Sequence, residues 1–79
     1  MASRRANGVA IREIRKALGI SQTALAAAVG VDKSAMSRIE NGTQQPKPET
    51  LLKICGRLGV PIDAITSSVA DPEPKARVS

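Results

Sequence analysis

Apolar and polar residues follow a helical period along most of the chain, most clearly between residues 21 and 42. Two apolar stripes occur there, and they consist of Leu25, Ala26 and Val29, then Met36 and Ile39. Gly30 lies between the stripes, and glycine adopts a positive φ without strain, so the chain can reverse there within a few residues. The pattern predicts two short helices that meet at an angle across a tight turn.

The ends of these two helices carry recognisable signals. Ser21 and Asp32 are favourable N-cap residues, and Asn41-Gly42 is a strong stop signal, so we expect helices over about 22–29 and 33–41. The outward face of the second helix consists of Lys33, Ser34, Ser37, Arg38 and Asn41. A basic face with short hydroxyls suits base edges and phosphates in a major groove. Taken alone, the helix is better read as a plain solvated amphipathic helix, whereas its place within the whole stretch from 21 to 42 favours the nucleic-acid interpretation.

Three further helices complete the expected fold. Ile11, Ile14 and Leu18 share one face of a helix over about 8–18, with Asn7 as its candidate cap. A fourth helix runs from Pro48 or Glu49 to about Leu58, and a short fifth helix follows near 61–65. We therefore predict an all-α domain over 8–66. Residues 1–7 are expected to form a flexible basic arm, and residues 67–79 a disordered tail.

The amino-acid composition favours some classes of function and argues against others. The 79 residues carry a formal charge of +5, and residues 1–60 hold ten Lys and Arg against four Asp and Glu, which favours a polyanionic partner over a partnerless basic protein. The single cysteine, Cys55, indicates a reducing compartment, and we expect a cytoplasmic protein without a membrane span. With no histidine, no nucleophile motif and no metal-ligand spacing, we expect no enzyme, no metal and no cofactor.

An ordered set of motifs resembles the phage-repressor/Cro-type (Xre-type) helix-turn-helix family. The motifs are GISQ at 19–22, LA at 25–26, VGV at 29–31, IENG at 39–42 and LGV at 58–60. The resemblance covers about residues 8–66 and implies a compact five-helix, lambda-repressor-like DNA-binding domain. It also implies a sequence-specific transcriptional regulator, most simply a small repressor that inserts the 33–41 helix into the major groove. The alternative function is an antitoxin-like or adaptor module that grips a protein with the tail.

The resemblance also assigns roles to individual residues. The base-reading positions that it implies are Lys33, Ser34 and Arg38. The phosphate-contacting positions that we predict are Arg12, Gln22, Ser37, Asn41, Thr43 and Lys47. Arg15 and Glu40 match an ion pair that ties the first helix to the third and orients it.

We expect a homodimer on double-stranded DNA, formed or completed on the operator. The last two predicted helices carry more apolar residues than one side of a small core should absorb. The dimer contact is therefore predicted at Leu58, Val60, Ile62 and Ile65. The sequence departs from the family by lacking an aromatic residue near Ala64 and Ile65.

Overall fold

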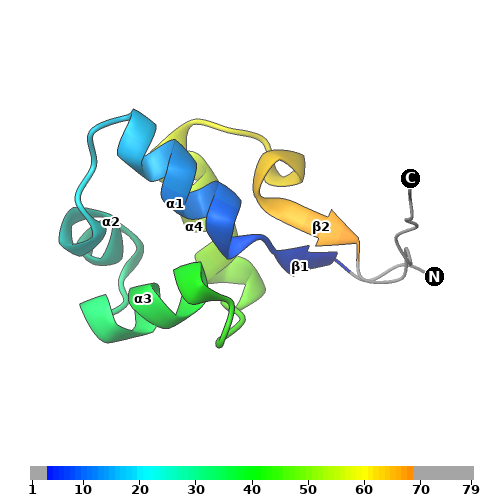
Figure 1. Cartoon of the computed structure of the whole chain (residues 1–79), viewed down its shortest axis with the longest axis horizontal. Coiled ribbons are helices and arrows are strands. Elements are labelled where there is room, and N and C mark those ends of the chain that lie inside the picture. The colour runs from blue at the N-terminus through cyan, green and yellow to red at the C-terminus, as the bar shows by residue number, and fades with distance from the viewer. Residues whose placement is uncertain (1–3, 69–79) are drawn as a thin grey trace.

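Four α-helices surround a small apolar core within residues 4–68, which are the residues that the computed structural model describes (Figure 1). The helices are α1 (Gly8–Ala17), α2 (Gln22–Val29), α3 (Lys33–Asn41) and α4 (Pro48–Leu58). The other elements are a 3₁₀ turn, η1 (Ile62–Ile65), and two strands, β1 (Arg4–Ala6) and β2 (Thr66–Ser68). In this part of the chain no helix has the length and apolar content needed to cross a membrane.

The first three helices begin at the caps that the sequence predicts. The side chains of Asn7, Ser21 and Asp32 each accept a hydrogen bond from the backbone N–H three residues further on. Each cap satisfies one of the N–H groups that a helix leaves unpaired at its start. Gly30 and Gly42 end α2 and α3 at positive φ, a conformation that side chains with a Cβ rarely adopt. Local sequence signals therefore set where α2 and α3 begin and end.

The core is aliphatic. Its fully buried apolar side chains are Ile11, Leu25, Met36, Ile39, Ile54 and Ile65. Because every helix contributes at least one of them, the core joins all four helices to η1. Cys55 lies at the edge of this cluster, and burial raises the pKa of its thiol, so it behaves as a small apolar side chain.

Gly8 brings the start of α1 against the end of α3. A Cβ at this position would overlap the carbonyl oxygens of Ile39 and Glu40. Only a residue without a side chain permits this approach of the two backbones. The contact places α1 across the last turn of α3, and so helps to fix the direction in which α3 leaves the core.

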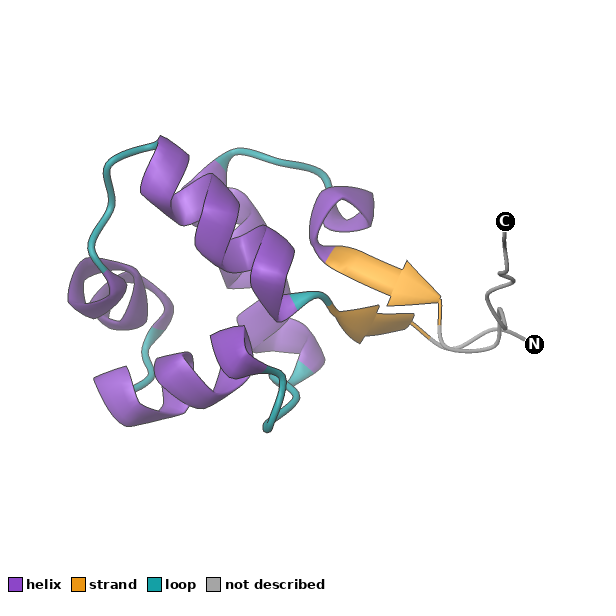
Figure 2. Cartoon of the chain, viewed as in Figure 1, coloured by secondary structure: helices purple, strands orange, loops and turns teal. Residues whose placement is uncertain are grey.

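The N-terminal segment is a strand, where we had expected a flexible arm. β1 pairs antiparallel with β2, with Arg5 opposite Ser67, at one end of the molecule (Figure 2). The backbone N–H of Ala6 also donates to Gln45 Oε1 at 2.9 Å. The predicted arm over 1–7 and tail over 67–79 are therefore wrong at residues 4–6 and 67–68. Residues 1–3 and 69–79 lie outside the described residues, and there both expectations stay predictions.

The fifth helix is also shorter than predicted. Ile62–Ile65 forms a single 3₁₀ turn, and β2 begins at the next residue. Four residues between Pro61 and the strand leave room for only one turn, which Thr66 closes by donating its hydroxyl to the carbonyl oxygen of Ile62 at 2.9 Å. The described fold is thus mostly helical with a two-stranded sheet, and the expectation of five α-helices is corrected to four.

Candidate nucleic-acid interface

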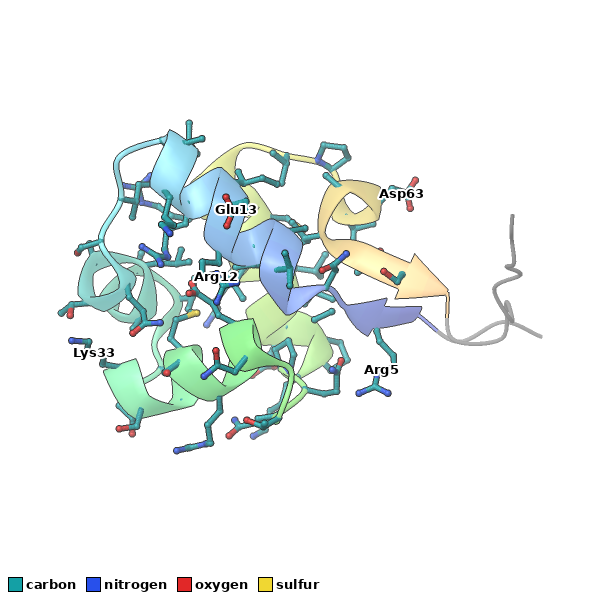
Figure 3. The ribbon with its side chains drawn as sticks, in the orientation of Figure 1. Arg5, Arg12, Glu13, Lys33 and Asp63 are labelled. Atoms are coloured by element: carbon teal, nitrogen blue, oxygen red, sulfur yellow. The ribbon has the colours of Figure 1, made fainter. Side chains whose placement is uncertain are left out.

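The exposed side of α3 borders an open depression at the start of α2. Its volume is about 400 Å³, and its lining residues are Gln22, Lys33, Ser34, Ser37 and Arg38. Figure 3 shows Lys33 at the beginning of α3, with its side chain at the outer edge of the molecule below α2. The structure therefore brings all three predicted base-reading residues together with two of the predicted phosphate-contacting residues. Two of the five lining side chains are cationic, and none is acidic.

Arg38 is held by the loop that follows α3. Its Nε donates to Gln44 Oε1 at 2.8 Å, although the side chain itself is exposed. Its carbonyl oxygen accepts from the backbone N–H groups of Thr43 at 3.0 Å and Gln44 at 3.3 Å. These bonds wrap the loop around the last turn of α3. Sequence analysis selected Thr43 and Lys47 of this loop as phosphate contacts but missed Gln44.

A buried charge network lies behind α3. Arg15 Nε donates to Glu40 Oε2 at 2.8 Å, and Arg15 Nη2 donates to Glu40 Oε1 at 3.2 Å. Gln22 Nε2 donates to Glu40 Oε1 at 3.1 Å, and Arg15 Nη1 donates to the Ile20 carbonyl oxygen at 2.9 Å. The ion pair that the resemblance implies is therefore present. Since a buried carboxylate is costly without donors, the network ties α1 and the start of α2 to α3.

The remaining predicted phosphate contacts lie at the other end of α3 and on α1. Asn41, Thr43 and Lys47 are exposed on the last turn of α3 and the loop after it. Arg12 is half-buried on α1, and its Nε lies 3.9 Å from Glu13 Oε2, a weak contact between partly exposed side chains (Figure 3). Of the predicted set, only Gln22 and Ser37 line the depression on α3.

Arg5 is a candidate contact that sequence analysis placed only in a flexible basic arm. It lines a second depression of about 300 Å³ together with Asn41 and Gly42 at the end of α3. Figure 3 shows its side chain extending from β1 toward the same side of the molecule as α3. Its guanidinium has no ion pair or hydrogen bond among the described residues. The signal in the sequence was the Arg4-Arg5 pair, but nothing local indicated the strand that fixes it.

The four residues of the predicted dimer contact differ in exposure within the single chain. Leu58 is 5% exposed and Ile65 is fully buried, because both fill the core. Val60 packs against that core at partial exposure, while Ile62 is 38% exposed. An apolar surface at this end of the described chain can therefore use Val60 and Ile62, but not Leu58 and Ile65. Among the large apolar side chains of the described residues, Leu52 on α4 is the most exposed, at 60%.

No group of three or more His, Cys, Asp or Glu side chains between residues 4 and 68 is arranged to hold a metal ion. The features that the described residues do bring together are a cationic helix face, a buried carboxylate network and a basic strand. All three adjoin α3.

Comparison with known proteins finds helix-turn-helix transcriptional regulators. A family model described as helix-turn-helix matches residues 11–65. The chain is 32% identical over 77 residues to an HTH-type transcriptional regulator of Mycobacterium tuberculosis, covering 98% of this chain and 30% of that protein. It is 39% identical over 57 residues to the cryptic phage CTXphi transcriptional repressor RstR of Vibrio cholerae, covering 72% of this chain and 51% of that one.

A solved structure resembles the fold at similar identity. The P22 c2 repressor, crystallised with a synthetic operator, superposes with a TM-score of 0.68 at 39% identity. The match covers 71% of this chain and 85% of the repressor chain. Against the two curated relatives, by contrast, the chain spans only about a third to a half of their length.

Proposed function

The chain belongs to the helix-turn-helix family, and from that membership we propose that it binds double-stranded DNA at specific sequences and regulates transcription, most simply as a repressor. Two kinds of relative support the proposal. One is a phage transcriptional repressor, and the other is a repressor whose structure contains a synthetic operator. The family is one of DNA-binding regulators, so the role is binding rather than catalysis.

The observation that carries this proposal is the depression along α3. Lys33, Ser34 and Arg38 project from one exposed face of a helix that is narrow enough to enter a major groove. Arg38 is suited to guanine, whose O6 and N7 accept two bonds from a guanidinium. The short side chains of Ser34 and Ser37 let the helix backbone approach the bases.

Phosphate contacts at both ends of α3 would fix the helix in the groove. Gln22 lies in the first turn of α2, where helix N-termini attract anions, and its amide nitrogen has a second hydrogen beyond the one given to Glu40. Asn41, Thr43 and Lys47 follow α3 at the opposite end. Phosphate contacts from these side chains would fix the position of the protein along the duplex, but they would not read the base sequence.

We further propose that two copies bind one operator. One recognition helix with three base-reading side chains contacts too few base pairs to distinguish an operator from other DNA sequences. Two helices spaced about 34–36 Å apart would read successive turns of one DNA face. Val60 and Ile62 supply the exposed apolar atoms for the contact between copies.

Selection of bound sites from a random duplex pool tests the function. We expect an enriched inverted repeat with the full chain, and loss of that enrichment when Lys33 and Arg38 are both replaced by alanine. The matched control is the double variant Lys53→Ala, Arg57→Ala on α4, which removes the same charge outside the α3 depression. A pool without enrichment, or equal loss in both double variants, overturns the proposal.

A further inference from the structure

The guanidinium of Arg38 is oriented by a residue outside the recognition helix. Gln44 Oε1 accepts from Arg38 Nε at 2.8 Å, while the backbone N–H of Gln44 donates to the carbonyl oxygen of Arg38 at 3.3 Å. Thr43 adds bonds to the same carbonyl from its N–H at 3.0 Å and its hydroxyl at 3.3 Å. The loop is thus anchored to the backbone of the residue whose side chain it holds.

This arrangement restricts how Arg38 can present its donors. A guanidinium has five N–H groups in a planar fork, one on Nε and two on each terminal nitrogen. Because the Nε–H is bonded to Gln44, only the two terminal nitrogens remain for a ligand. They lie at the outer end of the group, at the spacing that bonds guanine O6 and N7 together.

We infer that Gln44 is a positioning residue that sets the base preference of Arg38. The inference rests on the proposed function, because it requires α3 to face DNA. Gln44 holds the guanidinium before DNA arrives, and less side-chain freedom is therefore lost on binding. Because the Nε–H is already bonded to Gln44, a base cannot bind Arg38 through Nε. Arg38 is therefore restricted to binding a base through its two terminal nitrogens.

The next residue provides a matched control. Gln45 belongs to the same loop, but its Oε1 accepts from the backbone N–H of Ala6 at 2.9 Å and so holds β1. Two consecutive glutamines thus hold different partners, a side chain of the recognition helix and the N-terminal strand. Alanine at either position removes the same atoms from the loop.

The test measures binding to the best selected site and to duplexes in which each guanine pair is replaced in turn. We expect Arg38→Ala to reduce the preference for one guanine about tenfold to a hundredfold. We expect Gln44→Ala to reduce the same preference about three- to tenfold, and Gln45→Ala to leave it unchanged. Gln44→Glu keeps an acceptor for Nε, so the preference should persist while affinity falls on every duplex.

A double variant distinguishes positioning from direct contact. With Arg38→Ala already present, Gln44→Ala should have no further effect on base preference. Full preference in Gln44→Ala, or an equal loss with and without Arg38, overturns the inference. If wild-type protein shows no base preference, the proposed function fails; if Arg38→Ala loses preference and Gln44→Ala does not, only the role of Gln44 fails.

Discussion

Arg15 and Glu40 form a buried ion pair between α1 and α3, with Arg15 Nε 2.8 Å from Glu40 Oε2. The carboxylate side chain is 1% exposed and the guanidinium 11%. Gln22, at the start of α2, donates to the same carboxylate. The pair therefore lies where the three elements of the proposed interface meet, and its role is to fix their relative orientation.

Arg15→Ala should destabilise the fold strongly. The substitution leaves a buried carboxylate without its cationic partner, and breaking such a pair typically costs about 3–5 kcal/mol of unfolding free energy. Arg12→Ala on the same helix is the control, since its 3.9 Å contact with Glu13 is exposed and should contribute less than about 1 kcal/mol. Urea unfolding of both variants measures the difference, and equal losses would show that the network carries no special weight.

Gly8→Ala should also be destabilising, by about 1–3 kcal/mol or more, because the new methyl group meets the carbonyl oxygens of Ile39 and Glu40 and forces α1 away from α3. Gly56→Ala is the matched control. Gly56 lies inside α4 with open space around a Cβ, so alanine there should stabilise the protein by about 0.5–1 kcal/mol. Opposite signs in urea unfolding support the close approach at Gly8, and a neutral Gly8→Ala contradicts it.

These two contacts illustrate what sequence reasoning can and cannot reach. Ser21, Asp32 and the glycines at 30 and 42 act within one turn of their own position, so the ends of α2 and α3 were predictable. The need for glycine at position 8 arises from the carbonyl oxygens of Ile39 and Glu40, which a Cβ would overlap. These residues are about thirty positions away, so no local pattern encodes the contact. Only the resemblance to a known family pointed to the Arg15–Glu40 pair.

The β1–β2 pairing was unpredictable for the same reason. Each strand has three residues, too few to display an alternating pattern, and the partners lie at opposite ends of the described chain. Counting apolar residues near the last helix also did not separate core residues from exposed ones. Leu58 and Ile65 belong to the core, and periodicity alone does not say which apolar face is covered.

DNA binding should weaken steeply with salt. A basic surface that neutralises several phosphates per protomer predicts a slope of about −3 or steeper when log affinity is plotted against log salt concentration.

Arg5→Gln should weaken binding on specific and random duplexes alike and make the slope shallower by about one, because Arg5 lies beside Asn41 on the predicted phosphate side.

Arg57→Gln is the charge-matched control for Arg5→Gln. Arg57 is exposed in the last turn of α4 and borders neither the depression along α3 nor the one beside Arg5. We expect it to leave the slope within about a third of a unit of the wild-type value, since a remote charge releases few counterions. An equal change in both variants would mean that only net charge matters and that Arg5 contacts no phosphate.

The dimer contact should depend on Ile62. This side chain is 38% exposed at the end of the described chain, and Val60 lies two residues before it. Aspartate at 62 would place a charge in each copy at the two-fold contact, where burial of unpaired like charges is unfavourable. We expect Ile62→Asp to lower affinity about tenfold or more for an inverted repeat, and to leave affinity for a single half-site unchanged.

Leu52→Asp tests whether any exposed apolar residue would behave in this way. Leu52 is 60% exposed on α4, outside the predicted contact, so its variant should bind the inverted repeat like wild type. Sedimentation of each variant with and without DNA, together with its melting temperature, separates loss of dimerisation from loss of folding. A two-to-one complex that survives Ile62→Asp but not Leu52→Asp would move the contact to α4. A one-to-one complex of wild-type protein on its best selected site would exclude the dimer, because two-fold recognition requires two copies on one operator.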